Sequence, residues 1–445
     1  MNRAMVTFAV LAAAFSARAN VTCPASDTTK NMPEGCKLVR RAAFDVGSGS
    51  VKLAMADIKS CNGRVVCTRP VAIPREFRSR AVNLQRFADY NVQPPKVYLT
   101  ASMRDELVKN LIELNDYAHN NGALEYVGAA TNALRLATDD ISKFPGPKSE
   151  TPVTKTAFID AVKRASGLSE LQVISQDLEG EYGFNGARAA MRTSGLAQDA
   201  ACTPEKTIAW DIGGGSIQVT TLENGLPVVD KAQWGADIFR RRVLEVQAAA
   251  NIATDNSKTR CAPRDGSPNP VGRENVDRFR REAHELIRNE GRRPDPRNPK
   301  TAGNDRFAKR IKKFANGRGC IAGIGGVHFG AVYTALQDNW SKLDKKCASG
   351  AAPAGYYTPK HVRCLAEYLA TKSDCDEPFT NDRFSPTNVT NLLLVLGFLD
   401  HFDFKDDQRI RALDVNMTNQ LLTGSGLSVG QVVPQQAGGA SGGSN

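Results

Sequence analysis

Two stretches of the chain repeat one pattern of apolar, glycine and polar positions. In each, an apolar run contains an aspartate, a glycine-rich segment follows, and an alternating apolar stretch resumes. The two are Ala43–Val51 and Ala209–Ile217, which share Ala, Asp, two Gly and Ser at matching positions. Alternation with a period of two is typical of strands, and clustered glycines are typical of tight turns. The pattern predicts two strand–turn–strand hairpins and, because they match, a duplicated supersecondary unit.

Three further segments read as buried strands that lead into turns or helices. Tyr126–Arg135 places Arg135 in the first turns of a helix, where a guanidinium can bind two phosphate oxygens; a solvated surface arginine is the alternative. Leu171–Tyr182 places Glu179 near a helix start, although acids there often serve only the helix dipole. Gly323–Gly326 follows a short apolar run and either closes over an anion or forms an ordinary turn.

The predicted turns have the composition of anion-binding loops. Glycine lets a phosphate approach the backbone, so that successive N–H groups and a serine hydroxyl can bind its oxygens. A neighbouring carboxylate would repel phosphate unless Mg²⁺ lies between them. We therefore expect Asp45 and Asp211 to bind Mg²⁺; two plain hairpin turns are the alternative. The expected phosphate-binding residues are Gly47, Ser48, Gly49, Ser50, Gly213, Gly214, Gly215, Ser216, Gly325 and Gly326.

Length and composition favour an ordinary soluble protein of two large lobes. The chain has 445 residues, of which 41% are hydrophobic and 24% charged. Residues 1–19 have the order of a secretory signal peptide, too short to span a membrane, and we expect cleavage after Ala19. Residues 424–445 are rich in glycine and are expected to form a flexible tail without chemistry.

Ten cysteines follow residue 19, an even number that suits disulfides in an oxidising compartment. No C-x-x-C pair occurs, which disfavours a zinc site. Short separations suggest Cys23 with Cys36, Cys61 with Cys67 and Cys364 with Cys375 as local disulfides. We expect an exported protein, periplasmic or secreted, with no membrane span.

Positive charge is concentrated in residues 273–318, which carry 15 Lys or Arg against 7 Asp or Glu, in a chain of net charge +11. Helical stretches are expected on both sides of the Pro294–Pro299 break. A solvated surface is one interpretation, and a track for a long polyanion is the other. Nucleic acid could use such a track too, but we do not expect it as a partner.

The order of motifs DxGSxS, ATxxLR, ISxxxEGxY, DIGGGS and GxGG resembles the Ppx/GppA exopolyphosphatase family of the actin/Hsp70/sugar-kinase superfold, over about residues 38 to 422. The resemblance implies an α/β fold of two ribonuclease-H-like lobes, residues 20–180 and 181–423, with the active site in the cleft between them. It implies that Glu179 prepares a water for attack on a terminal phosphoryl group, with Arg135 binding phosphate. Mg²⁺ or another divalent cation would be associated with Asp45 and Asp211.

Three positions depart from that family: Gly49 stands for Asn, Ile217 for Thr and Gln218 for Glu. Gln218, which we count with the catalytic positions, and the run Glu179–Phe184 resemble instead the secreted apyrases, the nucleoside triphosphate diphosphohydrolases. Both kinds of enzyme hydrolyse phosphoanhydrides. The expected function is therefore exported exopolyphosphatase, with apyrase as the alternative and a non-catalytic phosphoanion-binding protein as the third. The substrate partner is polyphosphate or a nucleotide, and a homodimer is left open.

Overall fold

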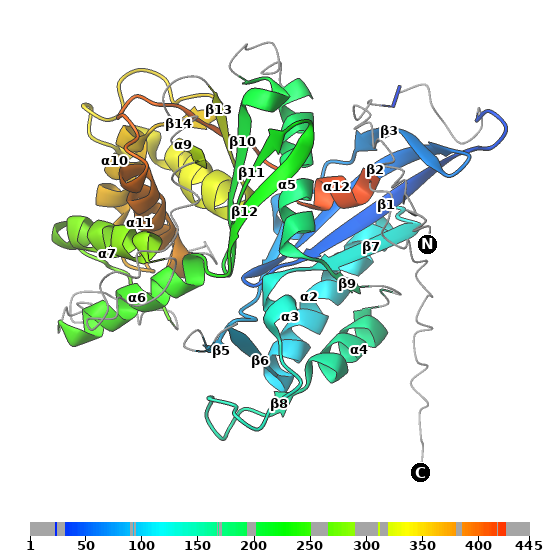
Figure 1. Ribbon diagram of the computed structural model, residues 1–445, viewed down its shortest axis with the longest axis horizontal. Coiled ribbons are helices and arrows are strands. Elements are labelled where there is room, and N and C mark those ends of the chain that lie inside the picture. The colour runs from blue at the N-terminus through cyan, green and yellow to red at the C-terminus, as the bar shows by residue number, and fades with distance from the viewer. Residues whose placement is uncertain are drawn as a thin grey trace, which may run out of the picture.

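The computed structural model describes residues 23–24, 32–89, 92, 95–166, 168, 171–193, 202–250, 266–289, 310–311, 319–379, 385–415 and 417–423. Its strands form two six-stranded sheets and one three-stranded sheet within these ranges. Figure 1 shows the two large sheets in separate halves of the molecule, with α5 (Gln176–Thr193) and α12 (Met417–Thr423) between them. The expected signal peptide and tail lie outside the described residues.

The first large sheet has the order β3-β2-β1-β7-β9, with β4 paired to β2. The β1–β2 and β2–β3 pairs are antiparallel, whereas β7 runs parallel to both β1 and β9. The inner half of β1, from Arg41 to Val46, is buried throughout, as expected of a central strand covered on both faces. The strands are β1 (Cys36–Val46), β2 (Ser50–Cys61), β3 (Arg64–Pro70), β4 (Ser79–Ala81), β7 (Glu125–Ala130) and β9 (Leu171–Val173).

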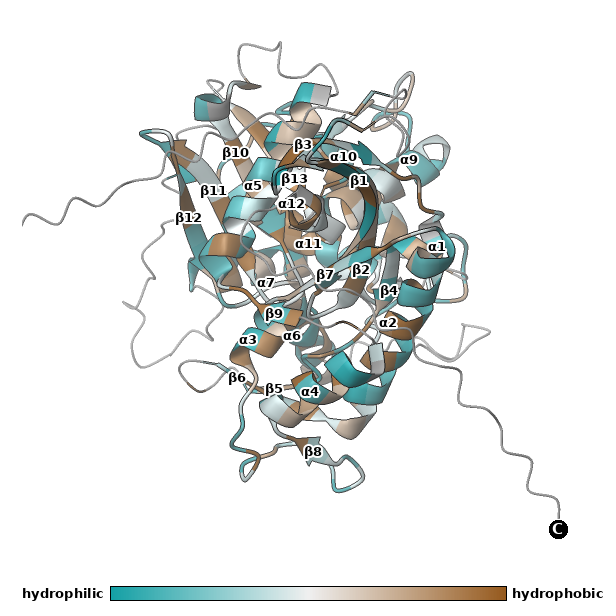
Figure 2. Ribbon diagram, turned by 90° about the vertical axis from the view of Figure 1, so that its right-hand side faces the viewer, coloured by the Kyte–Doolittle hydropathy of each residue, from teal (hydrophilic) through white to brown (hydrophobic). Residues whose placement is uncertain are grey.

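The long helix α2 (Ala101–Asn120) on the outer side of this sheet buries one face. In α2, Thr100 caps the first turn by accepting from the Met103 N–H at 3.4 Å, and Leu107, Leu111 and Leu114 are fully buried. Their spacing of three and four residues gives α2 one apolar stripe, and Figure 2 shows hydrophilic residues on the same helix. The helices are α1 (Arg75–Arg78), α2 (Ala101–Asn120), α3 (Asn132–Leu136) and α4 (Lys155–Ser166); the small sheet joins β5 (Phe87–Asp89), β6 (Lys96–Thr100) and β8 (Pro152–Val153).

The second large sheet has the order β12-β11-β10-β13-β15-β14. Three antiparallel strands are again followed by parallel ones, because β10 pairs antiparallel with β11 and parallel with β13. Its strands are β10 (Thr207–Ile212), β11 (Ile217–Glu223), β12 (Leu226–Ala232), β13 (Cys320–Ile324), β14 (Tyr356–Tyr357) and β15 (Ile410–Ala412).

Helices of the second half cover the outer side of this sheet (Figure 1). They are α6 (Ala236–Ala249), α7 (Val276–Arg288), a π-helix (Gly326–Thr334), α9 (Ala335–Asn339), α10 (Pro359–Leu369) and α11 (Ser385–His401), with 3-10 turns at Pro204–Lys206, Arg273–Asn275 and Trp340–Lys342. Five strands of each sheet thus repeat one topology, β3-β2-β1-β7-β9 and β12-β11-β10-β13-β15, whereas the sixth strands, β4 and β14, pair differently. The repeat predicted from the glycine loops therefore extends to these five strands, and both predicted hairpins are confirmed.

Two helices fill the space between the sheets. In α5 (Gln176–Thr193), Tyr182 packs in the core beside β1 and β7, while Phe184 packs in the core beside β10 and β13. Near the end of the chain, α12 (Met417–Thr423) packs on the first sheet, where Leu421 joins the core that contains Tyr182. The helix that carries Glu179 is therefore held by both halves.

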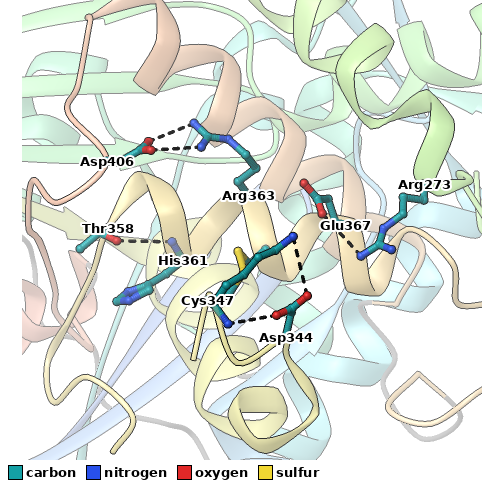
Figure 3. The surroundings of a disulfide bond; sticks show 10 residues. Arg273, Asp344, Cys347, Thr358, His361, Arg363, Glu367 and Asp406 are labelled. Atoms are coloured by element: carbon teal, nitrogen blue, oxygen red, sulfur yellow. Dashed lines mark hydrogen bonds and ion pairs between the residues drawn. A yellow bond between two sulfur atoms is a disulfide. The ribbon is translucent and has the colours of Figure 1, made fainter. Parts of the chain in front are cut away.

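Four disulfides join described cysteines: Cys23–Cys67, Cys36–Cys61, Cys202–Cys320 and Cys347–Cys364. The three pairs suggested by short separations are wrong. For one pair the strand register explains the bond, since Cys36 and Cys61 face each other across β1 and β2. Figure 3 shows the surroundings of Cys347, where Arg363 pairs with Asp406 and Arg273 with Glu367. No described helix is long and apolar enough to cross a membrane.

Candidate functional site

The first glycine loop joins β1 to β2 and is closed by backbone bonds. The Gly47 N–H donates to Ser50 O at 2.9 Å, and Leu84 and Val82 donate to the carbonyls of Ser48 and Gly49. Asp45, two residues before Gly47 and still in β1, is buried, and its Oδ1 has no hydrogen-bond partner. The Ser48 hydroxyl is likewise buried and unpartnered. The loop therefore presents polar groups that its own structure does not satisfy.

The second loop joins β10 to β11 in the same way. The Gly213 N–H donates to Ser216 O at 2.8 Å, as Gly47 does to Ser50 in the first copy. The carbonyls of Gly213 and Gly214 accept from the first N–H groups of α6. Gln218 Nε2 donates to Ser216 Oγ at 3.0 Å, so Gln218 orients this serine.

The two loops face each other. A Cβ built on Gly214 would lie 3.6 Å from the backbone nitrogen of Gly49. Asn132, at the start of α3, donates from Nδ2 to Gly215 O at 2.7 Å and ties the first half to the second loop. The structure thus brings together the two sets of phosphate-binding residues predicted from the sequence.

Glu179 and Arg135 meet at the carboxyl ends of β7 and β9, where the topology aligns α3 and α5. Arg135 Nη2 lies 3.0 Å from Glu179 Oε2, and Nη1 donates to Ile174 O at 2.8 Å. Glu179 is held in place by Gly180, whose close packing leaves no room for a Cβ against Val229. Burial raises the pKa of Glu179 to about 7, against the opposing effect of Arg135 and with help from Asp211 and Asp45. Such a carboxylate can accept a proton near neutral pH.

Asp211 is the penultimate residue of β10 and lies beside the third glycine cluster. Burial raises its pKa to about 6, while Lys52 opposes that rise. Gly325 has a φ of 78°, and a Cβ there would lie 2.4 Å from Asp211 Oδ1, so only glycine fits. Gly326 then begins the π-helix and faces open space. The third cluster therefore lies beside Asp211, and its binding of an anion stays a prediction.

Lys52 is a site residue that the motif analysis missed. Its Nζ lies 2.9 Å from Asp45 Oδ2, and 22% of its side chain is exposed. Burial alone would lower the pKa of Lys52, but Asp45, Asp211 and Glu179 more than reverse the effect and raise it. The signal was present in the sequence, because Lys52 occupies in the first repeat the position that Gln218 occupies in the second.

The carboxylate oxygens of Asp45 and Asp211 suit a cation whose other ligands are phosphate and water. Within the described residues, no group of three or more His, Cys, Asp or Glu side chains could hold a metal. Mg²⁺, however, usually takes one or two carboxylates and completes its shell with water and substrate oxygens. The unpartnered Asp45 Oδ1 and the half-buried Asp211 carboxylate offer such ligands.

The basic segment is only partly described. The predicted helix is present as α7, but Arg292, Arg293, Lys309, Lys312 and Lys313 lie outside the described residues. Arg280 pairs with Asp400 and Asp277, and Arg288 pairs with Glu285. Arg310 pairs with Asp230 and Glu223. Each of these three arginines has a carboxylate partner, and the track for a polyanion stays a prediction.

Comparison with known proteins identifies the fold. No family model matches the sequence, and no curated protein matches it. An exopolyphosphatase-like protein of known structure is 14% identical, with 88% of this chain and 98% of that chain covered at a TM-score of 0.54. An exopolyphosphatase from Cytophaga hutchinsonii is 14% identical, with 86% and 97% covered at 0.52. A Ppx/GppA family member from Aquifex aeolicus is 17% identical, with 87% and 97% covered at 0.48.

The likeness to the first two structures shows that this chain has their fold. The predicted α/β class, with two lobes of the actin-like superfold, is thereby confirmed.

Proposed function

We propose that this protein hydrolyses phosphoanhydride bonds and releases the terminal phosphate of inorganic polyphosphate. The observation that carries the proposal is the position of Glu179, paired with Arg135 and close enough to Asp45 and Asp211 for their charges to raise its pKa. In-line attack on phosphorus requires a positioned water and neutralised oxygens, and little covalent chemistry from the protein. Polyphosphate is the first substrate to test, because exopolyphosphatases share the fold.

Each group has a role in this proposal. Backbone N–H groups of the two loops bind the terminal phosphate, and Ser48 and Ser216 add hydroxyl donors. The Lys52 ammonium and the Arg135 guanidinium offset the charge that develops on the phosphoryl oxygens. Glu179 accepts a proton from the attacking water. Asp45 or Asp211 would hold Mg²⁺, which would supply further charge neutralisation when bound.

In our proposal Gln218 positions Ser216 of the second loop and does not contact the reacting atoms. It is 2% exposed, and it bonds to Ser216 on the second loop. An apyrase activity on nucleoside tri- or diphosphates is the second candidate, because glutamine rather than glutamate occupies this position. A homodimer and the lobe boundaries at residues 20–180 and 181–423 also remain proposals.

We further propose that the protein is exported and acts in the periplasm or outside the cell. The described cysteines are all in disulfides, which form and persist in oxidising compartments. The segment 1–19 would be its signal peptide.

Phosphate release from polyphosphate, ATP and ADP, each with and without Mg²⁺, tests the proposed reaction. Release from polyphosphate that requires Mg²⁺ and is lost in Glu179→Gln would support it. Release from ATP and ADP alone would favour the apyrase function, and binding of all three without release would favour a non-catalytic protein.

A further inference from the structure

The first turn of α5 is bonded to the second large sheet by a side chain that the proposed mechanism does not use. Gln176, the first residue of α5, is 5% exposed. Its Nε2 donates to Ala232 O at 2.8 Å and to Ile217 O at 3.3 Å. Because both partners are carbonyl oxygens, only the NH₂ group of the amide can make these bonds. Gln176 therefore joins the start of α5 to β11 and β12 at once.

The two accepting carbonyls lie at the end of the strands next to the second glycine loop. Ile217 faces Ala232 as the first pair of the β11–β12 ladder, and Ile217 directly follows Ser216 of the loop. Glu179 follows Gln176 by three residues, which is less than one turn of the helix. One amide thus connects the strand that leaves the loop with the helical turn that carries the proposed base.

The next turn of α5 is fixed on the same sheet. Thr220 Oγ1 donates to Gly180 O at 3.2 Å, and a Cβ on Gly180 would lie 2.6 Å from Val229 Cγ1. A Cβ on Gly183 would lie 2.8 Å from Ile324 Cδ1. Contacts this close leave the helix little freedom to shift, because packed interiors respond even to changes of one methylene group. The backbone around Glu179 is therefore held by the second sheet.

The side chain of Glu179, in contrast, meets the first half of the molecule, where Arg135 Nη2 lies 3.0 Å from its Oε2. We propose that Gln176 is a positioning residue that keeps Glu179 at a fixed place relative to the second glycine loop. This inference rests on the proposed function, in which Glu179 takes a proton from the water that attacks a phosphate held by that loop. Gln176 does not contact the reacting atoms and acts through Glu179. A small displacement of a catalytic group lowers the rate more than it weakens binding.

Gln176→Met tests the proposal, because methionine keeps the length of the side chain and removes its donors. We expect kcat for phosphate release from polyphosphate to fall by about tenfold or more, with KM within about twofold of the wild type. Binding of imidodiphosphate, whose P–N–P link resists hydrolysis, should likewise stay within about twofold.

Asp177→Asn is the matched control, because it removes an exposed ion pair that joins the same turn of α5 to Lys231 of β12. Exposed pairs contribute little, so its kcat should stay within about twofold of the wild type. Equal losses of kcat in Asp177→Asn and Gln176→Met, or no loss in Gln176→Met, would overturn the proposal.

A double variant separates positioning from general damage to the fold. In the Glu179→Gln background, Gln176→Met should lower the residual single-turnover rate by less than about twofold, because a base that is absent cannot be misplaced. A further loss as large as in the wild-type background would show that Gln176 does not act through Glu179.

Hydrogen exchange of the full chain distinguishes failure of this inference from failure of the proposed function. In Gln176→Met, peptides covering residues 176–182 should exchange faster, because the turn is released from the sheet, whereas Asp177→Asn should leave them unchanged. Unchanged exchange in Gln176→Met would overturn the role of Gln176. If the wild type hydrolyses no phosphoanhydride and exchange still rises in Gln176→Met alone, the proposed function fails and Gln176 still fixes the position of Glu179.

Discussion

Lys52 and Asp45 face each other across the first hairpin, with Lys52 Nζ 2.9 Å from Asp45 Oδ2. At the matching place in the second hairpin, Gln218 faces Asp211. The two hairpins therefore differ in charge at one matching position, which is lysine in the first and glutamine in the second. One loop carries a neutralised aspartate, and the other carries an aspartate whose pKa burial raises to about 6. Because Asp211 faces a neutral glutamine and Asp45 faces a lysine, Asp211 is the better candidate for a cation ligand.

Replacement of Lys52 tests this asymmetry. Lys52→Gln gives the first hairpin the residue that the second has at the matching position. It also removes the ammonium group that pairs with Asp45. We expect kcat for polyphosphate to fall by about tenfold or more, because one cation near the phosphoryl oxygens is lost. The Mg²⁺ concentration for half-maximal rate should also change. Lys52→Arg, which keeps the charge, should retain more activity, and equal losses in the two variants would contradict a role for the charge itself.

Stability should depend on pH through the raised carboxyl pKa values. Glu179 moves from 4.5 to about 7 and Asp211 from 3.8 to about 6, so the folded state binds more protons than the unfolded state between about pH 4 and pH 7. The free energy of unfolding should therefore fall as pH rises through this window, by about 3 kcal/mol for a shift the size of that of Glu179.

Urea unfolding at several pH values, with a chelator present, measures this slope. Glu179→Gln should flatten it, because the amide does not titrate. A slope identical to that of the wild type would show that the carboxyl group is not protonated in this window.

Alanine at three glycines should separate steric cost from ligand contact. In Gly215→Ala the new Cβ meets Gln85 and Asn132 below 2.5 Å, so we expect a loss of about 1–3 kcal/mol in stability. Gly49 has nothing within 4 Å of such a Cβ, so Gly49→Ala should fold normally while its methyl group blocks phosphate and raises KM. Gly330→Ala, also in open space but in the π-helix, is the control and should change neither property.

Peptide mapping without reductant should recover the disulfides that the structure shows. The Cys36–Cys61 pair joins residues opposite each other on β1 and β2, and Cys202–Cys320 joins the segment before β10 to the start of β13. We expect both linked peptides and no alkylation of the described cysteines. A Cys23–Cys36 peptide as the main product would contradict the register.

The sequence was most informative where chemistry and local pattern coincide. The repeated glycine loops predicted both hairpins, and the motif order placed Arg135 and Glu179 on the helices where they occur. Contacts between residues on neighbouring strands were harder to predict from the sequence. The contact of Lys52 with Asp45 and the Cys36–Cys61 disulfide both follow from one register, which is apparent only when the whole hairpin is aligned.

Contacts between distant segments could not be predicted from pattern at all. Leu421 packs with residues of β1 and β7, although α12 follows the strands of the second sheet in sequence. Gln176 bonds to Ala232, which lies 56 positions further along the chain and belongs to no motif. The alternation of apolar and polar residues along a segment indicates which of its side chains are buried. It does not identify the segment that covers them.

The central claim is that Glu179 takes the proton from the attacking water. Glu179→Gln keeps the shape of the side chain and removes its basicity, so we expect kcat for phosphate release to fall by about 10² or more while substrate binding is retained. The most direct measurement compares single-turnover phosphate release and imidodiphosphate binding in Glu179→Gln and the wild type. Lost release with unchanged binding is the predicted result, and release at the wild-type rate would contradict the claim.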